Sequence, residues 1–125
     1  MKPTLPYLKE KFAHFNNLIF NGRLPEIPIF LCEVKTFVGQ YKSKIKYHPD
    51  GRREHYLHAL RFSTCFDLPE RQLEDVIIHE MIHYFIAYNG LHDRSAHGPL
   101  FKALMKSVNE THGRSLTISL RIPTR

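Results

Sequence analysis

Two histidines and a glutamate occupy a five-residue segment inside a strongly apolar stretch. This arrangement constrains the fold more than any other feature of the sequence. In His79-Glu80-Met81-Ile82-His83 the two histidines are four residues apart, so on a helix both imidazoles leave the same face. The flanking positions are largely apolar, and a helix this apolar is buried. Burying two histidines and a glutamate without partners is costly. The stretch therefore predicts a buried helix that holds a metal. The alternative is a core helix whose histidines bond backbone carbonyls.

The spacing of these three residues is that of a zinc site. Two histidines one turn apart can bind one zinc ion, and the glutamate after the first can act as general base for a water that the metal activates. The boundaries of the helix agree with this interpretation. Asp67-Leu68-Pro69-Glu70 predicts a capping box about three turns before the motif, and Asn89-Gly90 predicts the end of the helix.

A catalytic zinc site needs a third protein ligand and an open position for water. The metzincin pattern has its third histidine ten residues after the first, where this chain has Asn89, so that class is excluded. His97 is the best placed candidate, because it follows a short loop, precedes a new helix and is followed by Gly98, which permits close approach of the backbone. We predict His97 as the third ligand, with Glu110 and His92 as alternatives.

The other periodicities predict an α+β fold in one domain over residues 1–125, with a core at about 7–110. A small, mostly antiparallel sheet is expected to pack on the metal helix. Further helices are expected at 7–20 and from Pro99 to about 109, and strands at 29–34, 39–47, 55–63 and 116–122. The last strand either joins the sheet or indicates that the chain is cut from a longer protein.

The positive charge is concentrated ahead of the metal helix. Residues 1–65 carry 11 Lys/Arg against 5 Asp/Glu, whereas residues 66–125 carry 7 of each. This excess indicates attraction to an anionic partner such as nucleic acid, the alternative being a solvated surface. In the predicted hairpin, His55 and His58 are out of phase and are expected on opposite faces, without a second metal site. The candidate phosphate contacts are Lys42, Lys44, Lys46, Arg52 and Arg53.

Composition also bears on the compartment. Cys32 and Cys65 are far apart and form no CxxC pair, which is typical of reduced packing residues. Prolines and charges interrupt residues 1–12, so no signal-peptide core is present there, and no apolar run is long enough to span a membrane. These features predict a cytoplasmic protein, in contact with the nucleoid if it binds DNA, and no membrane partner.

The motif and its surroundings resemble the SprT-like metallopeptidase family, which includes the Spartan DNA-dependent proteases. His79-Glu80-Met81-Ile82-His83 is followed, fourteen residues after His83, by His97-Gly98-Pro99-Leu100-Phe101, and residues 18–25 and Gly39 are also similar. The resemblance covers residues 7–110. It implies a zincin-like minimal metalloprotease domain in which His79, His83 and His97 bind Zn²⁺ and Glu80 is the catalytic base.

The resemblance also implies a substrate class. The best-known members hydrolyse proteins bound or crosslinked to DNA, so a role in repair of DNA–protein crosslinks is expected. This chain has no cysteine beyond position 65, so we expect it to lack the C-terminal zinc ribbon of many bacterial relatives. We also expect the DNA-reading subdomain of the Spartan type to be missing or truncated. Any DNA contact would then fall to the basic hairpin.

Zinc-assisted peptide hydrolysis is therefore our main hypothesis. We expect the strand at residues 60–63 to pair with an extended substrate, and Tyr84, Tyr88 and Arg94 are candidates for stabilising the oxyanion. One alternative is a nucleic-acid-binding module with a structural zinc, although such a site has no use for Glu80. Another is a zinc hydrolase of non-peptide substrates.

Overall fold

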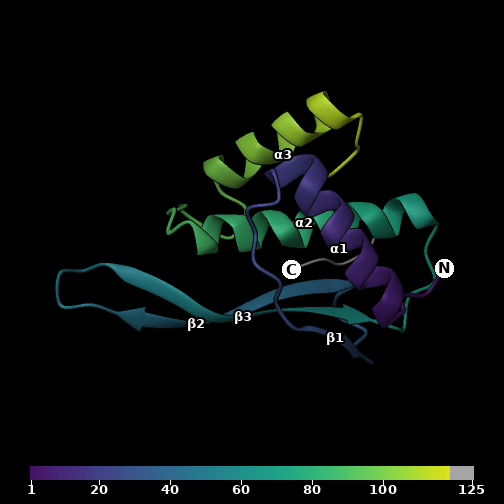
Figure 1. The fold of residues 1–125 in the computed structure, drawn as a ribbon, viewed down its shortest axis with the longest axis horizontal. Helices are drawn as coiled ribbons and strands as arrows, with labels where there is room; N and C mark the ends of the chain where they lie inside the picture. The colour runs from purple at the N-terminus through teal and green to yellow at the C-terminus, as the bar shows by residue number, and fades with distance from the viewer. Residues whose placement is uncertain (119–125) are drawn as a thin grey trace.

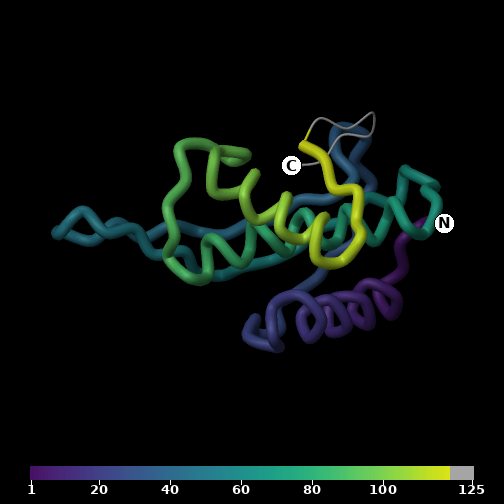
Figure 2. Tube along the Cα trace, turned by 90° about the horizontal axis from the view of Figure 1, so that it is seen from above, coloured from purple at the N-terminus to yellow at the C-terminus, as the bar shows by residue number. Residues whose placement is uncertain are grey.

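Three helices lie on one face of a three-stranded sheet, as expected for an α+β fold (Figure 1). The computed structural model describes residues 1–118. Seen from above, α1 runs along one side of α2, and α3 crosses over its other side (Figure 2). In chain order the elements are α1 (Leu5–Phe20), β1 (Ile29–Cys32), β2 (Gly39–Tyr47), β3 (Arg53–Ser63), α2 (Glu70–Tyr88) and α3 (Pro99–His112).

The sheet is mixed, and β3 is its central strand. The strand order is β1-β3-β2, with β1 parallel to β3 and β2 antiparallel to it. Pairs such as Ile29 with Leu60 and Gly39 with Phe62 set the two registers. The prediction of a mostly antiparallel sheet therefore holds for the hairpin but missed the parallel β1. The outer half of the β2–β3 hairpin extends beyond the helices (Figures 1 and 2).

A bulge in β3 corrects the predicted facing of two histidines. The register passes from Lys42 opposite Ala59 to Lys44 opposite Tyr56, so β3 has one additional residue there. Leu57 in this segment has a left-handed backbone with φ of 52°. The additional residue shifts the alternation of side chains along β3 by one position. As a result both rings meet the same face of β2, where His55 Nδ1 lies 2.8 Å from Ser43 Oγ and His58 Nδ1 lies 2.6 Å from Tyr41 Oη.

The two ends of α2 differ in how well they match the prediction. The helix begins at Glu70, but no side chain caps it, because the Asp67 carboxylate pairs with the amino group of Met1 instead. The predicted capping box was therefore wrong: Pro69, not Asp67, is the N-cap residue, and the helix begins later than the box implied. At the other end Asn89 is the cap residue, and Gly90 follows with φ of 65°. This left-handed glycine ends the helix as predicted.

The absence of a side chain at Gly39 lets α2 lie close to the sheet. A Cβ atom built there would be 2.8 Å from Val76 Cγ1, 3.1 Å from Glu80 Cγ and 3.2 Å from Phe62 Cδ1. These atoms belong to buried side chains of α2 and β3, so they have little room to move. Gly39 thus sets the depth at which the motif helix lies against β2.

We expect Gly39→Ala to lower the free energy of unfolding by about 1–3 kcal/mol, because an added methyl group overpacks this contact. Equilibrium unfolding in urea measures the effect. Lys44→Ala is the matched control, since Lys44 is exposed on the same strand and should change stability by less than about 0.5 kcal/mol. Equal stability of the Gly39→Ala variant and the wild type would contradict the close approach.

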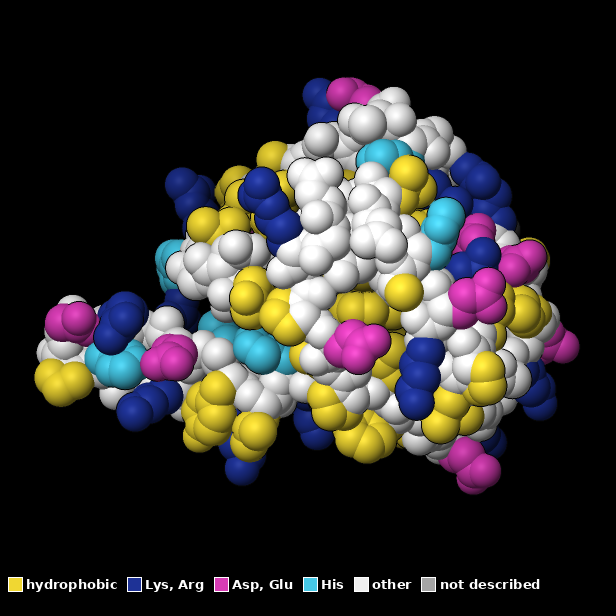
Figure 3. Space-filling view, viewed as in Figure 1, with side chains coloured by type: hydrophobic (Ala, Val, Ile, Leu, Met, Phe, Trp, Pro, Cys, Tyr) yellow, Lys and Arg dark blue, Asp and Glu magenta, His cyan; other side chains and the backbone are white. Residues whose placement is uncertain are grey.

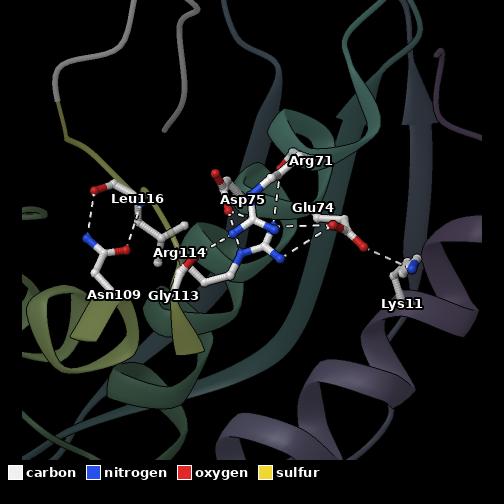
Figure 4. Close-up of polar contacts among 8 residues, drawn as sticks. All are labelled: Lys11, Arg71, Glu74, Asp75, Asn109, Gly113, Arg114 and Leu116. Carbon is white, nitrogen blue, oxygen red and sulfur yellow. Dashed lines mark hydrogen bonds and ion pairs between the residues drawn. The ribbon is translucent and has the colours of Figure 1, made fainter. Parts of the chain in front are cut away.

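The segment after α3 is tied back onto α1 and α2 by polar contacts (Figure 4). Arg114 lies 2.7 Å from Asp75 and 3.3 Å from Glu74, and Lys11 lies 2.9 Å from the same Glu74. These partners are largely shielded from solvent, which strengthens the ion pairs. The side-chain amide of Asn109 holds both backbone groups of Leu116, which is buried.

The strand predicted at residues 116–122 lies mainly outside the described residues. Its first three residues, 116–118, are described and are not part of the sheet. Within residues 1–118 no helix is long and apolar enough to cross a membrane.

Candidate metal centre

The structure brings together three of the predicted site histidines. His79 and His83 project from α2, and His97 comes from the loop that precedes α3. His97 Nε2 lies 3.0 Å from His79 Nε2 and 3.2 Å from His83 Nε2. One nitrogen from each of the three rings lies within 4.8 Å of the other two. Within residues 1–118 this is the one such group of potential metal ligands.

The two alternative ligands lie elsewhere. Glu110 is an exposed residue of α3, 3.9 Å from Lys106. His92 contacts the guanidinium of Arg53 at the hairpin. Neither residue belongs to the histidine group, so the geometry favours His97 as the third ligand.

The histidine group is held in its neutral form. Burial, together with the neighbouring His83 and His97, lowers the pKa of His79 to about 3. Burial, followed by the effect of His97, lowers the pKa of His83 to about 4. Burial also lowers the pKa of His97. Neutral imidazoles present nitrogen lone pairs, which is the form that binds a metal ion.

The spacing of these nitrogens fits a metal better than hydrogen bonds. His97 Nε2 faces two other ring nitrogens, and a single proton on it can be donated to only one of them. A tetrahedral zinc ion with Zn–N distances of about 2.05 Å separates its ligand nitrogens by about 3.3 Å. The observed 3.0 and 3.2 Å are close to this value. Three imidazoles are also a donor set that suits zinc, so the residues present fit the ion.

Phe101, in the first turn of α3, forms the apolar wall of the group. Its ring centroid lies 4.8 Å from that of His79, 4.5 Å from His83 and 4.9 Å from His97. The side chain is completely buried. A rigid aromatic surface against all three imidazoles limits their rotamers and keeps water from their rear faces.

Asp93 organises the loop that carries His97, a role that was not predicted from the sequence. Its carboxylate accepts hydrogen bonds from the backbone amides of Phe101 (2.8 Å), Arg94 (2.9 Å) and Leu100 (3.3 Å). It thereby caps α3, whose N-cap residue, Gly98, has no side chain to do so. Gly98 is required here, because a Cβ atom would lie 2.1 Å from Asp93 Oδ1. Burial would raise the pKa of Asp93, but these amides outweigh it and lower the pKa.

An aspartate ahead of a Gly-Pro helix start was the available sequence signal. We expect Asp93→Ala to lower zinc affinity about tenfold, because residues that support metal ligands typically contribute 10–100-fold. Competition with a chromophoric chelator measures this affinity. Asp93→Asn, which keeps one acceptor oxygen, should lose less. Wild-type affinity in Asp93→Ala would show that the loop does not depend on this carboxylate.

Glu80 is the other buried polar residue of the motif. Its side chain is 0% exposed, and neither carboxylate oxygen has a hydrogen-bond partner among the described residues. Burial raises the pKa of Glu80 well above its usual value, while the nearby backbone of Tyr41 acts in the opposite direction. A carboxyl group without partners at this depth has no structural role that explains it, which is typical of a functional group.

Of the three candidates for stabilising an oxyanion, the structure removes one. Tyr84 is completely buried and its hydroxyl donates to the Pro25 carbonyl at 3.0 Å, so it is not available to a substrate. Tyr88 is 45% exposed, with its ring 6.3 Å from that of His58. Arg94 is exposed. The choice between these two stays open.

The predicted substrate-pairing strand at residues 60–63 was wrong, because sequence alone did not place β3 at the centre of the sheet. These residues pair with β1 on one side and β2 on the other, so they have no free edge. The outer strand on the hairpin side is β2. Gly39 and Tyr41 of β2 both lie beside Glu80, so the accessible strand next to the motif is β2.

The five predicted phosphate contacts lie on the hairpin and are exposed. The lysines are on β2, and the arginines are in or next to the turn. The bulge in β3 lies between Ala59, which pairs with Lys42, and Tyr56, which pairs with Lys44. Arg53 also contacts the loop between α2 and α3, through His92.

Comparisons with known proteins agree with the site. The sequence model of the SprT-like family matches residues 8–121. The chain is also similar to the DNA-dependent metalloprotease dvc-1 of Caenorhabditis elegans, with 39% identity over 117 residues. That match covers 90% of this chain but 30% of the relative. The chain therefore spans less than a third of the length of that protein.

Proposed function

Because this chain belongs to the SprT-like family, we propose that it is a zinc-dependent metallopeptidase with a zincin-like fold. The observation that carries the proposal is the convergence of three neutral imidazole nitrogens next to a buried glutamate whose carboxylate has no hydrogen-bond partner among residues 1–118. In this proposal His79, His83 and His97 bind one zinc ion, and Glu80 is the catalytic base.

The residues of the chain supply binding and proton transfer. Bound zinc would polarise the scissile carbonyl and lower the pKa of a water molecule toward about 7. Glu80, with its raised pKa, takes the proton of the attacking water and later gives it to the leaving amine. Burial favours this exchange, because a poorly solvated carboxylate binds a proton more readily than one in water. Phe101 excludes water from behind the histidines.

The outer strand β2 is the proposed site of substrate binding. An extended peptide can add to a free strand edge through main-chain hydrogen bonds. Because Tyr41 and Gly39 lie beside Glu80, a peptide paired there would pass the motif. Main-chain pairing would allow many sequences to be accepted, since it does not depend on side chains. The proposed substrates are therefore extended or unfolded segments of proteins.

Association with DNA is the second part of the proposal. The similar protein from Caenorhabditis elegans is named as DNA-dependent, and the excess of positive charge here lies in residues 1–65. The exposed lysines and arginines of the hairpin can approach phosphates from one end of the molecule. The proposed substrates are thus proteins bound or crosslinked to DNA.

Cleavage of an unfolded protein by the zinc-loaded chain, with and without DNA, tests this function. We expect cleavage that a chelator abolishes and that DNA increases, with a smaller increase at high salt. Cleavage without any effect of DNA would support the peptidase and contradict the DNA association. Salt-dependent DNA binding without cleavage of any protein tried would instead favour a nucleic-acid-binding module with a non-catalytic zinc.

A further inference from the structure

A pocket separate from the histidine group lies between the hairpin turn and the loop after α2. It has a volume of about 410 Å³. Arg53 spans it, donating a hydrogen bond from its guanidinium to His92 Nδ1 across 39 residues of sequence. The lining residues are Gly51, Arg52, Arg53, His55, Gly90, Leu91 and His92. Two arginines and two histidines therefore converge on one pocket, and none of the described residues that line it is a carboxylate.

The carboxylates nearest in sequence are already engaged elsewhere. Asp50 accepts a hydrogen bond from the backbone amide of Arg52, and Glu54 lies 2.8 Å from His48. The Asp93 carboxylate accepts hydrogen bonds from the backbone amides at the start of α3. Within residues 1–118 Arg53 forms no ion pair, and Arg52 has only a loose one of 3.9 Å to Asp50. Glu54 and Asp50 act on the charge of Arg52, and Asp93 acts on His92. Arg53 therefore brings to this pocket a positive charge that no ion pair among the described residues neutralises.

The donors in this pocket suit a phosphate group. A guanidinium presents a planar fork of donors that matches two phosphate oxygens, and only one donor of Arg53 is occupied by His92. His55 can contribute its Nε2, because Ser43 occupies Nδ1 at 2.8 Å. Gly51 and Gly90 have nothing within 4 Å of a built Cβ atom, so a tetrahedral anion can approach the backbone. Figure 3 shows Lys, Arg and His side chains over this hairpin, with Asp and Glu side chains between them.

The same pocket is joined to the metal centre through neighbouring residues. His92 precedes Asp93, whose carboxylate holds the amides of Leu100 and Phe101. The ring of Phe101 in turn packs on His79, His83 and His97. An anion bound by Arg53 and His92, which are already in contact, would fix the loop between α2 and α3 against the hairpin. That loop ends at His97.

We propose that this pocket binds one phosphate of a nucleic acid backbone and that the bound phosphate stabilises the loop carrying His97. The inference rests on the DNA association proposed above and deepens it, because it assigns the contact and links it to the metal centre. His55 and His92 enter the proposed DNA site, and Arg53 becomes its central residue. The test below uses no cleavage assay, so its failure is distinguishable from failure of the peptidase proposal.

The first test is binding of the zinc-loaded chain to a labelled oligonucleotide, with NMR signals of the Gly51 and Gly90 amides as local reporters. We expect both signals to shift on titration. Arg53→Gln should weaken binding about tenfold and lower the slope of log affinity against log salt by about one. Arg23→Gln is the matched control, since Arg23 is an exposed arginine after α1, far along the chain from the pocket. Equal weakening by both variants, or unshifted glycine signals, would overturn the assignment.

A second arm separates the two sources of phosphate. Inorganic phosphate is titrated at constant ionic strength into the same protein. Shifts of Gly51 and Gly90 with the oligonucleotide at far lower concentration support a nucleic acid site. Shifts with inorganic phosphate and none with the oligonucleotide would overturn nucleic acid binding and identify the pocket as a site for free phosphate.

The link to His97 is measured by the rate at which a chelator removes zinc. The oligonucleotide should slow removal fivefold or more in the wild type and in Arg23→Gln, in the range of ordinary coupling between sites. It should have no effect in Arg53→Gln. Removal at the same rate with and without the oligonucleotide in the wild type would overturn the link.

Discussion

Glu80→Gln is expected to lower kcat/KM for protein cleavage by about 10²–10⁴-fold while one zinc ion stays bound. General base catalysis typically contributes this much, and an amide cannot accept the proton of the attacking water. Zinc binding should persist because the metal ligands in the proposal are the three histidines. Folding should persist as well, since the carboxyl has no hydrogen-bond partner to lose among the described residues.

Glu110→Gln is the control for this change. It makes the same chemical substitution at an exposed residue of α3, where we expect activity within about twofold of wild type. Cleavage rates at several substrate concentrations, with zinc content measured on the same samples, separate the effects. Full activity in Glu80→Gln would remove Glu80 as the base. Loss of zinc together with activity would show that Glu80 supports the metal instead.

His97→Ala is expected to abolish both tight zinc binding and cleavage. It removes the ligand that lies 3.0 and 3.2 Å from the other two imidazoles, and two histidines alone form an incomplete site. Because metal binding is lost, we expect activity to fall to that of the chelated wild type. Competition with a chelator measures the affinity, and cleavage of an unfolded protein measures the activity.

Glu110→Ala and His92→Ala complete this comparison, because both residues were alternatives for the third ligand. Each should keep zinc, since Glu110 lies beside Lys106 and His92 beside Arg53. Zinc binding that survives in His97→Ala but is lost in Glu110→Ala would contradict the geometry of the site.

Local signals predicted much of the fold. The end of α2 at Asn89-Gly90, the start of α3 at Pro99 and the hairpin turn all follow from backbone preferences of a few neighbouring residues. These preferences depend on a few neighbouring residues, so they can be predicted from the sequence. The proposed metal ligands are similar, because the two histidines of α2 are fixed by one helical turn. The position of His97 depends instead on how the loop between α2 and α3 folds.

Other features depend on contacts between distant residues. The bulge at Leu57, which turns His55 and His58 to one face, is set by how the strands pair. The parallel pairing of β1, which closes the free edge of β3, requires the whole sheet. Asp67 was expected to cap α2, but Met1 takes its carboxylate. The role of Asp93 became visible only once the folded loop placed it at the amides of α3. The single-domain organisation and the cytoplasmic location stay predictions.

Titration of zinc into the chelated protein, with bound metal and cleavage of an unfolded protein followed together, tests the central claim most directly. We predict that both rise in parallel and saturate at one zinc ion per chain. Cleavage that continues in the chelated protein, or a chain that binds no zinc, would contradict a zinc peptidase centred on His79, His83, His97 and Glu80.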